Sequence, residues 1–316
     1  MASILNGEFV RDDMTSKAMG GTELLAHRLV DVVEPELLKD TQIHFSRVTQ
    51  EQDLSKRQVL YLHDLAADPA VNHLFQSTEV WEKIVFVSHW QRQQFHDKFK
   101  LIDQNKTFVV PNAIEPLQPS SKKEGPIKLI YTSTPHRGLE LLFPVFELLT
   151  NKFDIELEVF SSFGLYGWNV RDKPYEPLFE RLKAHPKVTY HGAQPNDVVR
   201  EALQRADIFA YPSIWTETSC LCLIEAMSAG LTCVHSSLGA LPETSKALTW
   251  QYDYASSLQI HINRFYAQMS NVLHMYESQG RDYMRAGGLF QKQLVDHHHN
   301  LNAFKRNWEK VLTSRV

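Results

Sequence analysis

Between residues 207 and 235 the chain reads DIFAYPSIWTETSCLCLIEAMSAGLTCVH. Residues 207–211 have the pattern of a buried strand, which Pro212 ends because proline has no amide hydrogen to give to a sheet. Residues 221–227 form an apolar stretch typical of a helix, and residues 231–235 form a second short apolar strand. This succession of strand, helix and strand predicts a unit of a parallel α/β sheet.

Two glutamates lie eight positions apart in this stretch, Glu217 in the loop and Glu225 in the helix, so both could face one crevice. The backbone amides of Ser219, Cys220 and Leu221 would be the unpaired donors at the start of the helix, which suit a diphosphate. The carboxylates can accept hydroxyl hydrogens from a ribose or a hexose. The spacing therefore suggests a sugar-nucleotide site, although a solvated helix face gives the same pattern in a chain with 37 acidic residues.

Strand-like runs alternate with helical patterns along the whole chain, which is typical of doubly wound parallel sheets. The expected strands are 43–48, 59–63, 84–88, 107–110, 128–132, 156–161, 187–190, 208–211 and 231–235. The segment 115–126 is rich in proline and polar residues and is the clearest linker. We therefore expect two Rossmann-like domains: residues 1–118 completed by about 298–316, and residues 119–297.

Three further elements are placed where a ligand could bind. Arg137 follows the strand 128–132 and a turn that begins at Ser133, so it should emerge at the carboxyl ends of the strands, where open α/β sheets bind ligands. Gly20 and Gly21 open a helix and allow a phosphate or sugar to approach the backbone. His63 ends the strand 59–63 and should point into the interdomain crevice. The alternatives are a surface ion pair for Arg137, a plain turn at the glycines and a structural histidine.

Taken in order, these elements resemble the retaining glycosyltransferases of family 4, which have the GT-B fold. The resemblance is carried by the motifs GGTE at 20–23, PNAIE at 111–115, RGL at 137–139, the Glu-x7-Glu pair at 217–225 and GALPE at 239–243. It covers nearly the whole chain, and its most specific part runs from residue 207 to residue 243. The opening strand that the fold expects is poorly matched by residues 2–10, and the first domain, which usually receives the acceptor, is short.

The resemblance implies a hexosyltransferase-type enzyme (EC 2.4) that moves a sugar from a nucleoside-diphosphate sugar, with Glu217, Arg137 and His63 as its catalytic residues. Glu225 would bind the ribose, Glu217 the hexose, and Arg137 the diphosphate. The implied donor-binding residues are Gly20, Gly21, Ser133, Arg137, Ser219, Cys220, Leu221 and Glu225. The lysine that many members carry shortly after the arginine is missing here. Residues 289–312 carry apolar side chains at roughly helical spacing. In the resembled fold the C-terminal helix crosses back to the first domain, and Trp308 would anchor it.

Composition limits the remaining choices. Hydrophobic residues at 43% and charged residues at 22% describe a globular protein, and no apolar run or leader pattern appears, so we expect a cytoplasmic location. The motif regions hold no Asp-x-Asp, so we expect neither a metal nor another cofactor. We interpret Cys220, Cys222 and Cys233 as reduced packing residues. The three histidines 297–299 favour an exposed helix turn over a ligand set.

The acceptor is an unidentified hydroxyl on a glycan, a lipid-linked molecule or a small molecule. A glycosyltransferase that acts on modified nucleic acid is an alternative, although a net charge of −4 disfavours broad contact with nucleic acid. Another is a catalytically silent sugar-nucleotide-binding protein. The segment 89–102 mixes aromatic and basic residues and would allow peripheral membrane contact, although such a helix more often packs on its own domain.

Overall fold

The computed structural model describes residues 3–10, 20–48, 52–119 and 125–314; residues 120–124 of the predicted linker lie outside the described residues. The chain is divided into two compact units. Unit 1 contains residues 1–115, 217–219 and 298–316, and unit 2 contains residues 116–216 and 220–297. The chain thus passes from unit 1 to unit 2 after residue 115, whereas the predicted boundary was residue 118.

Unit 1 is built on one sheet with the strand order β2-β1-β3-β4-β5-β6. The strands are β1 (Ser3–Leu5), β2 (Glu8–Phe9), β3 (Thr41–Phe45), β4 (Arg57–Leu62), β5 (Lys83–Phe86) and β6 (Thr107–Val109). Strands β3 to β6 are parallel and correspond to the four strands expected in this half, with boundaries that differ by up to three residues. The helices are α1 (Gly21–Val32), α2 (Pro35–Leu38), α3 (His89–Lys98) and α11 (Leu301–Thr313).

The N-terminal segment forms a hairpin and not the parallel opening strand of a Rossmann domain. Strand β1 pairs antiparallel with both β2 and β3. The turn is made by Asn6 and Gly7, whose φ angles of 52° and 85° are both positive, and an Asn-Gly pair is the usual choice for such a two-residue turn. The poor match of residues 2–10 to a parallel strand therefore has a structural cause.

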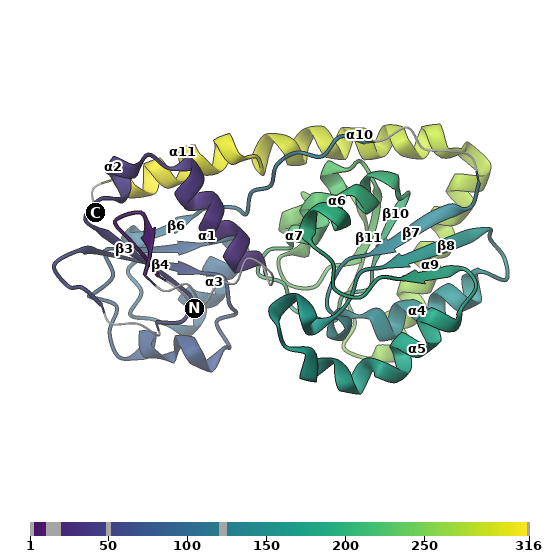
Figure 1. Cartoon of the computed structure of the whole chain (residues 1–316), viewed down its shortest axis with the longest axis horizontal. Helices are drawn as coiled ribbons and strands as arrows, with labels where there is room; N and C mark the ends of the chain where they lie inside the picture. Colours follow the sequence, from purple (N-terminus) through teal and green to yellow (C-terminus); the bar gives the residue numbers. More distant parts are fainter. Residues whose placement is uncertain (1–2, 11–19, 49–51, 120–124, 315–316) are drawn as a thin grey trace. The chain divides into compact units, whose positions relative to one another are not determined.

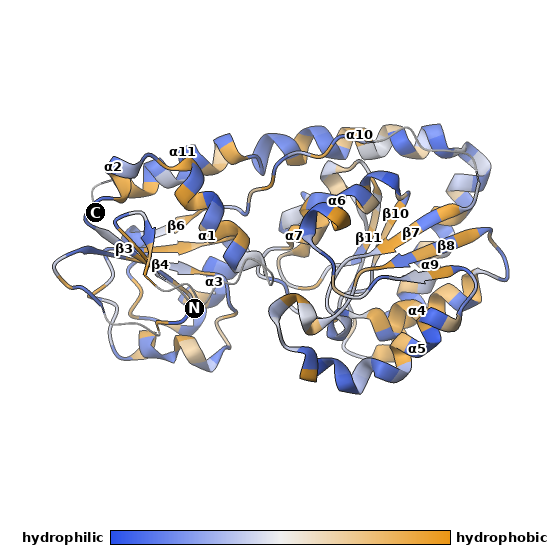
Figure 2. Cartoon of the chain, viewed as in Figure 1, coloured by the Kyte–Doolittle hydropathy of each residue, from blue (hydrophilic) through white to orange (hydrophobic). Residues whose placement is uncertain are grey.

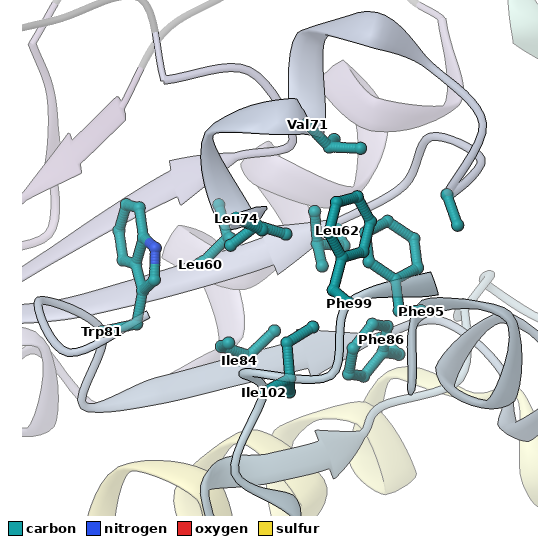
Figure 3. Packing of buried hydrophobic residues seen from close by; sticks show 11 residues of the cluster. Leu60, Leu62, Val71, Leu74, Trp81, Ile84, Phe86, Phe95, Phe99 and Ile102 are labelled. Carbon is teal, nitrogen blue, oxygen red and sulfur yellow. The ribbon is translucent and has the colours of Figure 1, made fainter. Parts of the chain in front are cut away.

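One apolar core of unit 1 lies between β4, β5 and α3 (Figure 3). Phe95 of α3 and Phe99 just after it are fully buried there against Phe86. These two aromatic side chains are therefore not available for the membrane contact that segment 89–102 suggested. No helix among the described residues has both the length and the apolar character needed to span a bilayer.

Unit 2 holds a fully parallel sheet with the strand order β12-β11-β10-β7-β8-β9 (Figure 1). The strands are β7 (Ile127–Tyr131), β8 (Ile155–Val159), β9 (Val188–Tyr190), β10 (Ile208–Tyr211), β11 (Thr232–Ser236) and β12 (Trp250–Tyr252). If the strands β7 to β12 are numbered 1 to 6, the order read from β9 to β12 is 3-2-1-4-5-6, which is the order of the Rossmann fold. The order turns between β7 and β10, which makes the gap between their carboxyl ends the expected ligand site.

The helices of this unit are α4 (Leu139–Leu149), α5 (Glu176–Ala184), α6 (Asn196–Arg205), α7 (Leu221–Ser228), α8 (Leu241–Ser245), α9 (Leu258–Gln279) and α10 (Arg281–His298). Helix α4 is apolar on most of its surface, as its colour in Figure 2 shows, and seven of its eleven residues are buried. The prediction of an α/β protein with two largely parallel sheets is confirmed.

The C-terminal helical stretch is broken at residues 299–300, where sequence periodicity suggested continuity through residues 289–312. Asn300 caps α11 by accepting the amide hydrogen of Ala303 at 2.8 Å. His299 is buried, with its Nδ1 2.6 Å from the carbonyl oxygen of Asn112, so it is not part of an exposed turn as predicted; His297 and His298 are exposed.

After the break, α11 returns to unit 1 and packs on α1 and α2. Trp308 is fully buried, and its ring lies edge-on to Tyr61 of β4 at 4.9 Å. Trp308, which was predicted to anchor the terminal helix, thus contacts a defined residue of the first unit.

Candidate functional site

The loops after β7 and β10 meet at the point where the strand order of unit 2 turns. Gly138 has a φ of 127°, and a Cβ atom built on it would lie 2.3 Å from the carbonyl oxygen of Pro212. The amide of Ile214 donates to the carbonyl oxygen of Arg137 at 3.3 Å. The two loops are therefore in backbone contact, and only glycine fits at position 138.

Arg137 and Ser133 lie in the loop after β7, as predicted. Ser133 is the second residue after the end of β7, and a short 3-10 turn (Pro135–Arg137) presents the arginine. The guanidinium carbon of Arg137 lies 5.9 Å from the ring centroid of Trp215, which belongs to the loop after β10. A cation beside an aromatic face at this edge is suited to an anionic ligand.

His136 is a neutral neighbour of this arginine. Its ring stacks on Phe163 at 5.1 Å and meets Trp215 edge-on at 4.9 Å. Burial, with the positive charges of Arg137 and Arg171, lowers the pKa of His136 to about 4. At neutral pH the positive charge of this loop therefore comes from Arg137 and not from the histidine.

Helix α7 begins directly after the loop that follows β10. Cys220 is its N-cap residue, in extended conformation, and Leu221 is the first helical residue. The first amides of a helix have no partner within it, so Cys220 and Leu221 provide donors and positive potential at this end. The predicted diphosphate-binding amides of these two residues thus lie at a real helix start.

Glu225 lies on α7 and is buried, and its carboxylate is held by α6. The Nδ2 atom of Asn196 and an Nη1 atom of Arg200 both donate to its Oε1 at 3.3 Å. A buried carboxylate needs such partners to offset the loss of its contacts with water. Sequence reasoning missed Asn196 and Arg200; the only signal is their spacing of four positions on one helix, which places both side chains on one face.

In unit 1 the predicted residues also gather at the carboxyl ends of parallel strands. Gly20 is the N-cap residue of α1, and Gly21 is its first residue. The Oγ1 atom of Thr22 in the first turn lies 2.9 Å from Nδ1 of His63. The paired glycines therefore place the start of α1 against the histidine that follows β4.

His63 is partly exposed, but its Nε2 atom is buried and has no hydrogen-bond partner among the described residues. Burial lowers the pKa of His63 to about 3, so the imidazole is neutral at physiological pH. Ser46, which sequence reasoning missed, fixes the backbone here: its Oγ accepts the amide hydrogens of His63 at 2.7 Å and Asp64 at 3.1 Å. Ser46 has a φ of 52°, which is uncommon for a serine.

Residues 217–219 group with unit 1 and not with the rest of the predicted second domain. Thr218 donates through Oγ1 to the carbonyl oxygen of His63 at 2.7 Å, and Ser88 donates to the carbonyl oxygen of Thr218 at 2.6 Å. Glu217 and Ser219 flank Thr218, and Glu217 is only 4% exposed. The predicted site residues thus form two groups, one in each unit: Gly20, Gly21, His63, Glu217 and Ser219 in the first, and Ser133, Arg137, Cys220, Leu221 and Glu225 in the second.

Residues 128–268, which lie in unit 2 except for residues 217–219, match the model of the family described as Glycosyl transferases group 1. This part of the chain is a glycosyltransferase domain. The resemblance noted in the sequence, and the prediction that the chain contains such an enzyme domain, are thereby confirmed at the level of the group 1 family.

Two curated relatives are subunits of phosphatidylinositol N-acetylglucosaminyltransferases. The human protein is 28% identical over 141 residues, which are 43% of this chain and 28% of that protein. The gpi3 subunit of Schizosaccharomyces pombe is 25% identical over 166 residues, which are 51% of this chain and 35% of that protein. Each match thus spans about a third of the relative's length.

Two solved structures have the same fold. A glycosyltransferase from Rickettsia africae ESF-5 superposes with a TM-score of 0.65 at 16% identity, covering 96% of this chain and 85% of that one. Anabaena Alr3699/HepE, solved in complex with UDP-glucose, gives a TM-score of 0.62 at 14% identity over 82% and 73% of the two chains. The predicted GT-B architecture is therefore confirmed.

Proposed function

We propose that the chain is a retaining glycosyltransferase that moves a hexose from a nucleoside-diphosphate sugar to a hydroxyl group. The observation that carries this proposal is the arrangement at the turning point of the unit 2 sheet. A loop cation, the start of α7 and a buried glutamate surround the carboxyl ends of β7 and β10, inside the region that matches the family model.

Each element has a task in this chemistry. Arg137 and the amides at the start of α7 neutralise the diphosphate as its oxygen leaves the anomeric carbon. Glu225 accepts hydrogen bonds from the ribose hydroxyls, and Glu217 from hydroxyls of the hexose. The acceptor oxygen bonds to the anomeric carbon on the face that the diphosphate leaves, and its proton passes to the departing phosphate oxygen.

The donor is proposed to be a UDP-sugar, because the Anabaena neighbour is described with UDP-glucose and the human relative is named for N-acetylglucosamine transfer. A direct test is thermal stabilisation and slow hydrolysis with UDP-, GDP-, ADP- and dTDP-sugars, since a ligand that binds only the native state raises its apparent stability. Stabilisation without any turnover toward an acceptor panel would favour the silent binding protein instead.

The acceptor side is proposed from unit 1 and from the human relative, whose name points to a phosphatidylinositol acceptor and to other subunits. A lipid-linked hydroxyl is therefore the first class to test, before glycans and small molecules. Phosphoinositide-containing vesicles would serve as the probe. The cytoplasmic location stays a prediction and is checked by fractionation of cells that produce the full-length protein.

Replacing Arg137 with alanine is expected to weaken binding of the free nucleoside diphosphate by roughly 1.5–3 kcal/mol, the usual worth of hydrogen bonds to a charged group. Isothermal titration with UDP measures this change. Arg181→Ala is the matched control, since that arginine forms an exposed ion pair with Glu147, and such pairs contribute little. Equal affinities for the wild type and Arg137→Ala would remove Arg137 from the diphosphate site.

Transfer is expected to continue when divalent metal ions are removed, because Arg137 and the helix amides are proposed to do the work that Mg²⁺ or Mn²⁺ does in metal-dependent transferases. Among the described residues no group of three or more histidine, cysteine or acidic side chains could hold a metal ion. Initial rates would be measured with EDTA and again after adding Mn²⁺. Loss of activity with EDTA that Mn²⁺ reverses would contradict the proposal.

A further inference from the structure

Two thiols are in contact at the start of α7. The Sγ atoms of Cys220 and Cys222 are 3.3 Å apart. Side chains two positions apart do not meet on a regular helix, because they point in different directions. Here they meet because Cys220, the N-cap residue, has an extended backbone with φ −117° and ψ 96°, while Cys222 is already helical.

The two thiols differ in access. Cys220 is 2% exposed, whereas Cys222 is half-buried and can meet a reagent from solvent. The third cysteine of the chain, Cys233, is fully buried in β11, and its sulfur lies 3.5 Å from the carbonyl oxygen of Leu231. The chain therefore contains one close thiol pair and a buried cysteine that serves as an internal control.

We propose that Cys220 and Cys222 are a reversible oxidation site at which a peroxide or a disulfide oxidant forms an intramolecular disulfide. With hydrogen peroxide, the Cys222 thiolate attacks one oxygen, the O–O bond breaks, and hydroxide leaves with formation of a sulfenic acid. The Cys220 sulfur then attacks the Cys222 sulfur, the S–O bond breaks, and water leaves. Two thiols and one peroxide thus give one disulfide and two waters.

The disulfide would act on the proposed donor site, and this part rests on the proposed function. A disulfide requires its sulfurs to be about 2.05 Å apart, so the two side chains must turn toward each other, and the bond then ties the N-cap residue to the first turn of α7. The same turn provides the amides proposed to bind the diphosphate, and Glu225 lies on the same helix. Oxidation is therefore expected to weaken the donor site, and reduction is expected to restore it.

The first measurement is a thiol count on the full chain. After treatment with hydrogen peroxide, the protein is denatured, alkylated and weighed by mass spectrometry. Alkylatable thiols are expected to fall from three to one, since two of the three cysteines pair. Cys233→Ser should fall from two to none, whereas Cys222→Ser should keep both of its thiols. Three remaining thiols in the wild type, or loss only through linkage of two chains on a non-reducing gel, would overturn the proposal.

The second measurement is UDP affinity before and after oxidation, with each variant compared with its own reduced form. We expect at least a tenfold loss for the wild type and for Cys233→Ser, reversed by dithiothreitol, and no change for Cys222→Ser. A disulfide that leaves the affinity unchanged would overturn the link to the donor site. If the reduced protein binds no nucleotide, the proposed function fails, while the thiol count still decides on the disulfide.

Discussion

Gly138→Ala is expected to destabilise the protein by more than about 2 kcal/mol and to abolish nucleotide binding. The φ of 127° at this position is strained for any residue with a Cβ atom, and that atom would lie 2.3 Å from a backbone oxygen of Pro212. A backbone neighbour cannot rotate away as a side chain can. The loops after β7 and β10 would therefore have to separate at the point where the donor is proposed to bind.

The measurement is the midpoint of urea unfolding, followed by titration with UDP. Gly167→Ala is the matched control, because Gly167 also has a positive φ, of 71°, but no atom of the described residues lies within 4 Å of a Cβ atom built there. That variant should lose only about 1 kcal/mol, the cost of the left-handed conformation. Equal shifts for the two variants would mean that the contact with Pro212 contributes nothing.

Glu217→Ala is expected to lower the turnover number by about 10²-fold or more while leaving the affinity for free UDP nearly unchanged. Electrostatic groups that act on charge developing in the transition state have effects of this size. Glu217 is proposed to contact only the hexose, so its loss should appear in turnover and not in nucleotide binding. Initial rates with the UDP-sugar and titrations with free UDP separate the two quantities.

Glu225→Gln provides the comparison. This substitution keeps the size of the side chain that Asn196 and Arg200 hold, but removes the charge proposed to bind the ribose. Free UDP and the UDP-sugar should therefore weaken together. If Glu217→Ala impairs UDP binding as strongly as Glu225→Gln does, the proposed division between sugar and ribose is wrong.

The sequence alone was enough for strands β3 to β11, but not for β1, β2 and β12. Apolar runs such as 208–211 are strands because they are short, buried and ended by proline or turn residues, and these properties are local. The positions of Arg137 after a strand, Glu217 in a loop and Glu225 in a helix follow from the same local patterns. Boundaries moved by a few residues, since an element ends where its last hydrogen bond is made.

Local patterns failed where distant contacts compete with periodicity. The helical repeat through residues 289–312 continues past residue 299, but the buried contact between His299 and Asn112 and the cap at Asn300 end one helix and start another. The N-terminal strands pair antiparallel because Asn6 and Gly7 form a tight turn, whereas the expected fold has a parallel strand there.

Only the tertiary structure decided the order of the strands and the partners of the site residues. The turn in strand order between β7 and β10 comes from pairing residues about 80 positions apart, such as Lys128 and Asp207. The packing of helices and strands places Arg200 beside Glu225 and the Ser46 hydroxyl against the backbone of His63. It also brings the two thiols at the start of α7 into contact. The sequence determined which side chains stand at element ends, because that is set by neighbours in the chain. Which of them meet was decided by the burial of apolar faces against one another, which brings together residues that no local pattern relates.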